Sequence, residues 1–493
     1  MRWHNVVPVL KLLEESSSLW IIPTPFLKHH LSFQIGSKAS PKGVLISDIS
    51  FICFFVVPGI SVASSVLESD GVINLPNQTQ TPWISQFAGY ITVNEEHGRA
   101  LFYWFFEAQS EPSQKPLLLW LNGGPGCSSI AYGAASELGP LRVGKNGVDL
   151  EFNQFAWNQE ANLLFVESPI GVGFSYTNTS SDLTKLDDAF VAEDAYNFLV
   201  KWLQRYPQFK SRDFFISGES YAGHYVPQLA ELVYDRNNDR SRYPFINLKG
   251  FMVENPVTDD NYDYTGIMDY AWSHSVIPDD LYRKSKQVCD FKALILSTEC
   301  NDVVNQVFDK YSEIDIYNIY APKCLFNTTS SSTANKKTNH GLKRVRILAG
   351  GHDPCYSEYA EMYFNRPDVQ KSIHADARGV KWESCKDSIL NTYNFSVFSV
   401  LPTYKKLIKA NLKIWMYSGD MDGRIPVISS RYCVEALGLP LKSPWRSWFH
   451  DQQVGGRMVV CEGLTLVTVR GAGHLVPRNK PSQALASSIL SCW

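Results

Sequence analysis

The sequence predicts an α/β fold with a mostly parallel central sheet. Short apolar runs rich in aromatic and β-branched residues alternate with longer segments of helical periodicity. Such runs are typical of strands buried on both faces, and their alternation with helices favours parallel strands covered on both sides. The 493-residue chain is 44% hydrophobic and 13% aromatic, so it can form a large core. Functional residues are then expected at the carboxyl ends of the strands.

One long helix and eight strands can be predicted from these patterns. The helix is expected over Asp187–Arg205, where apolar residues recur at helical spacing and Pro207 follows the end. The strands are expected at Gly89–Val93, Leu101–Phe106, Leu117–Leu121, Leu163–Val166, Phe214–Ser217, Leu248–Val253, Ile414–Tyr417 and Leu464–Val469.

Residues 1–65 differ in composition from the rest and are expected to form a leader. An apolar run from Ile49 to Ala63 follows two lysines and ends in a small-x-small pattern typical of signal-peptide cleavage. The run lies unusually far from Met1, so the leader is either a displaced signal peptide or an anchor. Both alternatives place the rest of the chain in the secretory pathway.

The remaining chain is expected to contain a core that is interrupted by an insertion. Strand patterns occupy residues 66–259 and 388–493, which would form the first and second parts of the core. Residues 260–387 carry few strand signals and predict a helical insertion. Within it, residues 327–346 are polar and low in complexity, so we expect a disordered loop that is open to proteolysis.

The composition favours an extracellular or vacuolar protein that binds neither nucleic acid nor metal. The net charge is −3, and no basic block is interleaved with aromatic residues. The ten cysteines show neither a C-x-x-C pair nor zinc-ligand spacing, which favours disulfides in an oxidising compartment. Four glycosylation sequons agree with this, at Asn77, Asn178, Asn327 and Asn394. No cofactor is expected, and the sequence leaves a homodimer open.

Ser220 lies in the run 214–223 (FFISGESYAG), where a strand pattern gives way to a helix pattern. A serine at such a strand-to-helix elbow projects its hydroxyl above the sheet, and small neighbours allow the sharp turn. The match to G-x-S-x-G is imperfect, because Ala222 occupies the fifth position. On this motif alone, Ser220 is either a nucleophile or an ordinary serine in a tight turn.

A serine nucleophile needs a base and an orienting carboxylate. Asp420 and Asp422 follow one predicted strand and His474 follows the last one, which gives the chain order of serine, aspartate and histidine expected after such an elbow. The spacing leaves Asp420 open as the alternative to Asp422, and a surface-loop histidine is the alternative for His474. An oxyanion hole needs two backbone amides, of which Tyr221 would supply one and the glycine-rich run 120–129 the other.

Several segments together carry a family resemblance: 120–129 (WLNGGPGCSS), 166–175 (VESPIGVGFS), 218–225 (GESYAGHY), and 419–426 with 471–477. From about Val72 to its C-terminus, the chain resembles the serine carboxypeptidases of plants, which include the type-D enzymes. The resemblance implies an α/β-hydrolase fold with an inserted helical cap domain. It also implies roles for five residues: Ser220 as nucleophile, His474 as base, Asp422 as the acid that orients the base, and Gly124 and Tyr221 as oxyanion amides.

The resemblance further implies that the substrate is the C-terminus of a peptide or protein, whose free carboxylate is bound next to the nucleophile. Asn122, the Gly123 backbone and Glu219 would bind this carboxylate, and Glu137 would pair with Glu219. Two clustered carboxyl groups and a substrate carboxylate cannot all be ionised, so one group must hold a proton. A protonated Glu219 can donate a hydrogen bond to the substrate. We therefore expect peptidase activity at acidic pH that falls as the pH rises through neutrality.

The resemblance also implies three disulfides, which are Cys127–Cys385, Cys289–Cys300 and Cys324–Cys355. Loss of Cys53 with the leader would leave nine cysteines. At least one of the remaining three, Cys433, Cys461 and Cys492, would then be free.

Two residues depart from the pattern of the resembling enzymes. Glu254 occupies a position where they usually have glycine, and we expect it close to the rim of the active site, where it would crowd the substrate pocket or change its charge. Leu475 follows the candidate base, where type-D enzymes that accept basic C-terminal residues tend to carry an acid. This departure favours apolar C-terminal residues in the substrate.

Two other functions compete with the peptidase. An acyltransferase of the same fold would use a sugar ester as acyl donor, but such enzymes tend to have aspartate before the serine and to lack the asparagine of the Asn-Gly-Gly run. Glu219 and Asn122 therefore favour the peptidase. A catalytically silent secreted binding protein is the second alternative, and the complete set of Ser220, Asp422 and His474 argues against it.

Overall fold

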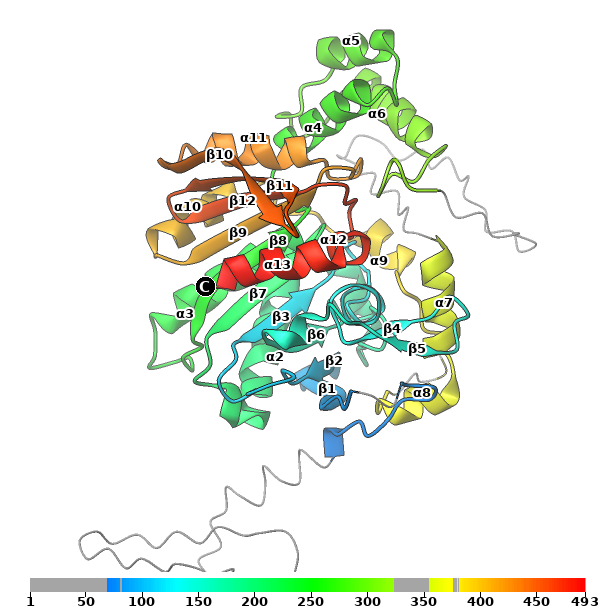
Figure 1. Cartoon of the computed structure of the whole chain (residues 1–493), viewed down its shortest axis with the longest axis vertical. Helices are drawn as coiled ribbons and strands as arrows, with labels where there is room; N and C mark the ends of the chain where they lie inside the picture. The colour runs from blue at the N-terminus through cyan, green and yellow to red at the C-terminus, as the bar shows by residue number, and fades with distance from the viewer. Residues whose placement is uncertain (1–68, 80–81, 323–353, 376–378, 380, 493) are drawn as a thin grey trace, which may run out of the picture. The chain divides into compact units, whose positions relative to one another are not determined.

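The computed structural model describes residues 69–79, 82–322, 354–375, 379 and 381–492 (Figure 1). The predicted leader (1–65), the low-complexity loop (327–346), and the candidate residues Cys324 and Asn327 lie outside the described residues.

A ten-stranded sheet forms the centre of the described chain, with six parallel strands in its middle and antiparallel strands at both edges (Figure 1). All eight predicted strands are present in it. In spatial order the strands are β1 (Gln86–Asn94), β2 (Arg99–Phe106), β6 (Asn162–Val166), β3 (Leu117–Leu121), β7 (Phe214–Glu219), β8 (Leu248–Glu254), β9 (Lys413–Gly419), β12 (Leu464–Val469), β11 (Gln453–Cys461) and β10 (Leu441–His450).

Helices cover both faces of this sheet, as strands that are apolar on both sides require. In β2, the side chains of Leu101, Tyr103 and Phe105 belong to one buried cluster, and the alternate side chains belong to the other. The first cluster includes residues of α2 (Asp188–Arg205), α3 (Ala222–Asn237), α10 (Leu401–Lys409) and α11 (Val427–Leu437). The second includes residues of η1 (Ile130–Glu137), α7 (Pro354–Phe364), α8 (Pro367–Ser372), α12 (Val476–Asn479) and α13 (Pro481–Cys492).

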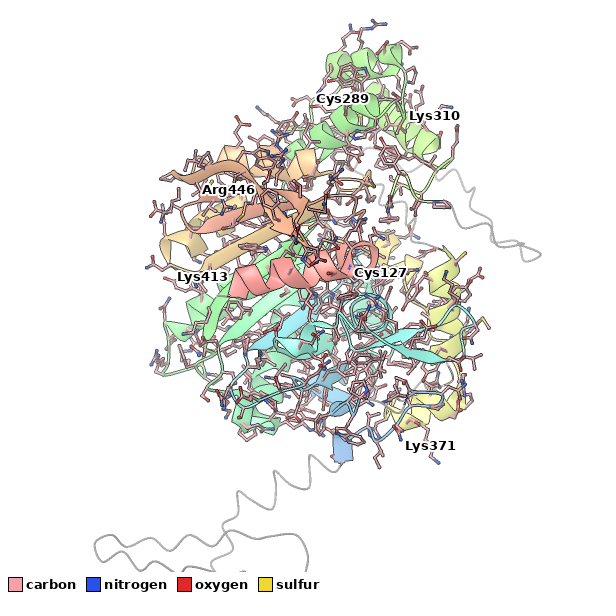
Figure 2. All side chains as sticks on the ribbon, viewed as in Figure 1. Cys127, Cys289, Lys310, Lys371, Lys413 and Arg446 are labelled. Carbon is pink, nitrogen blue, oxygen red and sulfur yellow. A yellow bond between two sulfur atoms is a disulfide. The ribbon has the colours of Figure 1, made fainter. Side chains whose placement is uncertain are left out.

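The predicted helical insertion contains only helices and loops among its described residues. Helices α4 (Asp260–Ser273), α5 (Asp279–Val288) and α6 (Thr298–Tyr311) share an apolar cluster separate from the two that line the sheet. A disulfide between Cys289 and Cys300 joins the end of α5 to α6, and Figure 2 labels Cys289 in this group of helices. The insertion therefore has its own small core, and its boundaries at 260 and 387 stay predictions.

Two observations bear on the cellular compartment: the exposure of the glycosylation sequons and the search for a membrane-spanning helix. The three sequon asparagines in the described chain, Asn77, Asn178 and Asn394, are exposed. Within the described ranges, no helix combines the length and the apolarity needed to cross a membrane.

Candidate active site

Five neighbouring parallel strands bring the predicted functional residues to one edge of the sheet. The strands β3, β7, β8, β9 and β12 are adjacent and parallel, so their carboxyl ends meet there. A cavity of about 170 Å³ opens at this edge. Its lining includes Asn122, Gly123, Gly124, Glu219, Ser220 and His474.

Ser220 occupies a strained turn between β7 and α3. Its backbone φ is +63°, a left-handed conformation that non-glycine residues rarely adopt. The turn is held by hydrogen bonds from Ser220 N to the Glu254 carbonyl (3.0 Å) and from the Gly223 and Val257 amides to the Ser220 carbonyl (2.9 Å each). A β-carbon on Gly223 would lie 2.3 Å from the Val257 carbonyl oxygen, so only glycine fits there. A strained serine between a strand and a helix, packed this closely, matches the backbone geometry of a nucleophile elbow.

Contacts of its side chain and of its backbone both position His474. Its Nδ1 lies 2.6 Å from Asp422 Oδ2, and its backbone amide donates to the Tyr317 carbonyl (2.6 Å). Asp422 is fully buried, and its other oxygen accepts hydrogen bonds from the amides of Arg424 (2.7 Å) and Ile425 (3.2 Å). A carboxylate paired with one nitrogen of a histidine can orient the ring so that the other nitrogen accepts a proton.

The structure distinguishes between the two aspartates that follow β9. Asp420 Oδ1 accepts a hydrogen bond from the Gly471 amide (2.7 Å), whereas Asp422 holds His474. Among the described residues, no hydrogen bond joins Ser220 to His474, although both line the cavity. Such contacts are often long in the absence of substrate and tighten when it binds.

The glycine-rich loop after β3 packs directly on the elbow. A β-carbon on Gly123 would lie 2.3 Å from the Tyr221 amide nitrogen and 2.8 Å from the Glu219 carbonyl oxygen. Gly124 has a φ of +111°, which favours glycine, and it lines the cavity. The backbones of Gly124 and Tyr221 therefore lie at the same end of the cavity as Ser220.

A cluster of buried carboxyl groups lies beside the elbow. Glu137, at the end of η1, is fully buried, and Glu219 is 4% exposed. Asn122 Nδ2 donates to Glu137 Oε1 (3.3 Å), and Asn122 is itself held by Trp120 Nε1 (2.8 Å) and the Gly133 amide (3.1 Å). One oxygen of each glutamate, Oε2, has no donor.

The pKa values of both glutamates are raised, chiefly because burial penalises their ionised forms. The pKa of Glu219 lies well above its usual range, since the charges of Glu137 and Glu254 add to the effect of burial. A side-chain hydrogen bond between Glu137 and Glu219 raises the pKa of Glu219 and lowers that of Glu137. Protonation of this cluster at acidic pH is therefore favoured.

Glu254, which we expect close to the rim of the active site, is fully buried and does not line the cavity. It is the last residue of β8 and the register partner of Glu219, so the two side chains share one face of the sheet. Oxygens of Glu137, Glu219 and Glu254 lie within 4.8 Å of one another, a spacing that could also hold a cation. Burial raises the pKa of all three glutamates, so protons can neutralise these charges in place of a cation.

Some residues of the site carry no sequence signal. The ring of Tyr317 lies 4.9 Å from the imidazole of His474, although Tyr317 belongs to the predicted insertion, far from His474 in the chain. Arg424 and Arg478 also line the cavity. Arg424 lies two residues after Asp422 in the sequence, whereas only the folded chain brings Tyr317 to His474.

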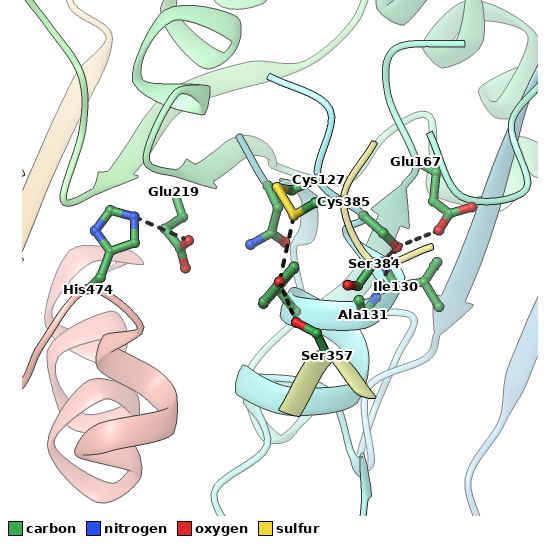
Figure 3. The surroundings of a disulfide bond; sticks show 12 residues. Cys127, Ile130, Ala131, Glu167, Glu219, Ser357, Ser384, Cys385 and His474 are labelled. Carbon is green, nitrogen blue, oxygen red and sulfur yellow. Dashed lines mark hydrogen bonds and ion pairs between the residues drawn. A yellow bond between two sulfur atoms is a disulfide. The ribbon is translucent and has the colours of Figure 1, made fainter. Parts of the chain in front are cut away.

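A disulfide supports the glycine-rich loop. Cys127, in this loop, is bonded to Cys385, and both cysteines line the cavity. Figure 3 shows this disulfide with His474 and Glu219 facing one another beside it, where His474 Nε2 lies 3.7 Å from Glu219 Oε1. The structure thus contains two of the three implied disulfides, and the third involves Cys324, outside the described residues. Cys433 and Cys461 are buried and free.

Comparisons with known proteins agree with this geometry. The sequence model of the family described as serine carboxypeptidase matches residues 76–489. Serine carboxypeptidase-like 33 of Arabidopsis thaliana is 66% identical over 429 residues, covering 85% of this chain and 90% of the relative. Serine carboxypeptidase-like 26 of Oryza sativa subsp. japonica is 63% identical over 427 residues, covering 85% and 89%.

Among solved structures, Kex1(delta)p, a prohormone-processing carboxypeptidase from Saccharomyces cerevisiae, has the same fold. The TM-score is 0.73 at 22% sequence identity, and the match covers 86% of this chain and 96% of the yeast chain. The expected α/β-hydrolase fold is thereby confirmed. By its sequence and its fold, the chain belongs to the serine carboxypeptidase family of hydrolases.

Proposed function

We propose that the protein is a serine carboxypeptidase that releases C-terminal amino acids from peptides at acidic pH. The observation that carries the proposal is the buried Glu137–Glu219 pair, which lies beside Ser220 and the Asp422–His474 hydrogen bond in one cavity. A serine hydrolase without preference for a free carboxylate has no need of this pair. The pair supports exopeptidase activity over the acyltransferase alternative.

Ser220 and His474 would carry out the reaction through an acyl-enzyme. His474 Nε2 takes the proton of Ser220 Oγ while Oγ bonds to the carbonyl carbon of the last peptide bond. The negative charge that develops on the carbonyl oxygen is stabilised by the Gly124 and Tyr221 amides. His474 then gives its proton to the leaving amine, and the C-terminal amino acid departs. Water, activated by His474 in the same way, cleaves the ester and restores Ser220.

The carboxylate of the substrate would be bound by Asn122, the Gly123 backbone and protonated Glu219. The raised pKa of Glu219 keeps its proton at acidic pH, so that it can donate to the substrate. As the pH rises through this pKa, Glu219 ionises and repels the carboxylate. Activity on peptides with a free C-terminus should therefore be present at acidic pH and lost on the alkaline side.

The proposal extends to the side-chain preference of the enzyme and to its cellular location. Leu475 and Leu390 line the cavity, which supports a preference for apolar C-terminal residues in the peptide. The two disulfides support an oxidising compartment, and we place the protein in the secretory pathway, either outside the cell or in the vacuole.

Release of free amino acids from a panel of N-blocked dipeptides at pH 5 tests this proposal. The wild-type protein is compared with Ser220→Ala, and the panel varies the C-terminal residue from apolar to basic and acidic. We expect release by the wild type, fastest for apolar residues, and none by the variant. A folded wild type that reacts with a fluorophosphonate at Ser220 but releases nothing would overturn the peptidase in favour of acyl transfer or ester hydrolysis. A protein that is not labelled at all would be a silent homologue.

A further inference from the structure

Three lysine and arginine side chains line the active-site cavity within the described part of the chain: Lys386, Arg424 and Arg478. Lys386 Nζ is paired with Glu383 Oε2 (2.6 Å), and Arg478 Nη1 donates to Ser136 Oγ (3.1 Å). Arg424 differs from both, because it is only 5% exposed and its buried Nη2 has no hydrogen-bond partner among the described residues. The wall of the cavity therefore contains a buried guanidinium with an unused donor.

The acids near Arg424 have other partners. A guanidinium stays charged at every physiological pH, and burying a charge is costly unless the charge is paired. The carboxyl group of Asp422 faces His474 with Oδ2, and its Oδ1 accepts two backbone amides, including that of Arg424 itself. Asp315, which also lines the cavity, accepts the Tyr317 amide on Oδ1 (3.0 Å). A group that enters the cavity can therefore reach Nη2, and a carboxylate matches a guanidinium best.

Contacts place Arg424 on the side of the cavity that the helical insertion covers. Its guanidinium lies over the ring of Phe308, on α6, at 5.4 Å from the ring centre. Burial raises the pKa of Tyr317 to about 12, and the positive charge of Arg424 acts against this rise. Tyr317 in turn packs on the imidazole of His474 (4.9 Å), whose Nε2 faces Glu219 (3.7 Å). Tyr317 and His474 thus connect Arg424 to the site where the peptide carboxylate would bind.

We propose that Arg424 is a specificity-determining residue whose guanidinium binds an acidic side chain on the residue before the scissile bond, so that the enzyme prefers peptides with aspartate or glutamate in the penultimate position. This inference rests on the proposed function, because it extends the same placement of the peptide. With the C-terminal carboxylate at Glu219 and the scissile carbonyl at Ser220, the penultimate residue continues beyond the nucleophile, away from the carboxylate pocket. Arg424 then recognises its side chain, while Leu475 and Leu390 contact the C-terminal residue.

Arg424 also has structural contacts that a test must separate from this role. Its backbone amide donates to Asp422 Oδ1 (2.7 Å), and its side chain packs on Phe308. A substitution keeps the amide, but a shifted loop would move Asp422 and slow the hydrolysis of every peptide by the same factor. Loss of a ligand for an acidic side chain would instead slow only the acidic peptides.

The experiment compares two N-blocked dipeptides that differ only in the charge of the penultimate residue, Glu-Leu and Gln-Leu. For each enzyme, the ratio of kcat/KM for Glu-Leu to kcat/KM for Gln-Leu is measured at pH 5.5, where a glutamate side chain is mostly ionised. The reversed pair, Leu-Glu and Leu-Gln, tests the C-terminal position. The variants are Arg424→Gln, Arg424→Lys, which retains the charge without the planar fork, and Arg478→Gln. Arg431→Gln is the matched control, since Arg431 is exposed and does not line the cavity.

We expect the wild type to prefer Glu-Leu by about 10- to 100-fold, the range for a hydrogen bond to a charged group. The ratio should fall close to one in Arg424→Gln, take an intermediate value in Arg424→Lys, and stay at the wild-type value in Arg431→Gln and Arg478→Gln. Each of three results would overturn the inference: equal wild-type rates on the two peptides, a preference that survives in Arg424→Gln, or a preference confined to the C-terminal position.

Two outcomes are separated from these by the same measurements. If Arg424→Gln does not fold, Arg478→Gln decides, because loss of the preference in that variant would assign the acidic side chain to the wrong arginine. A wild type that releases leucine from neither peptide contradicts the proposed function itself, whereas release at equal rates contradicts only the role of Arg424.

Discussion

At the scale of single residues, the contact that matters most for the proposed chemistry is the one between Asp422 and His474. The neighbouring Asp420 provides an internal comparison, since it lies two residues away and its carboxyl group accepts a hydrogen bond from the Gly471 amide, whereas that of Asp422 holds His474. Spacing in the sequence could not choose between these aspartates, because both follow the same strand. The choice depends on which side chain the turn after β9 points toward β12, and this is a property of the folded loop.

The first prediction contrasts the two aspartates. Asp422→Asn should lower kcat by about 10³–10⁴, because the amide holds His474 in the wrong tautomer. Asp420→Asn should lower kcat by less than about tenfold, because its carboxyl group only supports a loop. Steady-state hydrolysis of one N-blocked dipeptide at pH 5 measures both. Equal losses in the two variants would remove the reason for assigning Asp422 as the orienting acid.

Glu254 marks the limit of residue-level prediction from sequence. The sequence shows its departure from the family pattern, but it shows neither the full burial of the side chain nor its place beside Glu219. Whether a residue at a strand end points into the cavity or below it is decided by the register of that strand against its neighbours, which is a tertiary property.

At the scale of elements, close backbone contacts at the end of β7 hold the elbow. A β-carbon on Gly223 would lie 2.3 Å from the carbonyl oxygen of Val257, a backbone atom that cannot easily move. The same substitution at Gly89, in β1, would make only ordinary contacts, with the nearest atoms at 3.7 Å. The two glycines therefore form a matched pair.

The second prediction uses this pair. Gly223→Ala should lower the free energy of unfolding by about 1–3 kcal/mol through steric strain, and it should slow the labelling of Ser220 by a fluorophosphonate. Gly89→Ala should change neither quantity appreciably. Urea denaturation and labelling rates check both variants. Unchanged labelling in a folded Gly223→Ala protein would mean that the elbow does not depend on this contact.

The sequence predicts the buried strands of the sheet better than the strands near its edge. The eight predicted strands are short apolar runs. Two strands of the same sheet carry no such run: β10 forms its edge and β11 lies next to it. Strand β10 contains Pro444 and is largely exposed, and β11 contains Gly455 and Gly456, so neither has the composition of a buried strand. These strands exist because each pairs with a neighbour that is already in the sheet. No pattern within their own residues indicates that pairing.

At the scale of the whole molecule, buried acids make the stability of the fold depend on pH. Burial raises the pKa of Glu167 to about 7 and that of Asp263 to about 8, although each accepts hydrogen bonds from backbone amides. A carboxyl group whose pKa is higher in the folded state binds its proton more tightly there than in the unfolded chain. Its contribution is fully present below its unfolded pKa and is lost as the pH rises through 7 to 8. The protein should therefore be most stable in an acidic compartment, where the proposed activity also lies.

The third prediction follows from Glu167. The wild type should melt at a higher temperature at pH 5 than at pH 8.5. Glu167→Gln should bring the two melting temperatures closer together, because it removes about 3 kcal/mol from the difference in the free energy of unfolding between the two pH values. The exposed Glu95 offers a control, since its side chain is 77% exposed and Glu95→Gln should leave the difference unchanged. Calorimetry at the two pH values measures all three proteins. If the wild type melts at a higher temperature at pH 8.5, other titrating groups dominate the pH dependence of stability, and its assignment to the buried acids is wrong.

The central claim is that a protonated Glu219 binds the free carboxylate of the peptide. The most direct measurement is the preference for an N-blocked dipeptide over its C-terminal amide at pH 5 and pH 8, in the wild type and in Glu219→Gln. Because Ser220 and His474 act on both substrates, the ratio of the two hydrolysis rates depends on the carboxylate pocket alone. The wild type should prefer the free acid at pH 5 and lose the preference at pH 8, whereas the glutamine variant, whose side-chain donor cannot ionise, should show a preference that does not change with pH. A wild-type preference that is equal at both pH values, or absent at pH 5, would contradict the account.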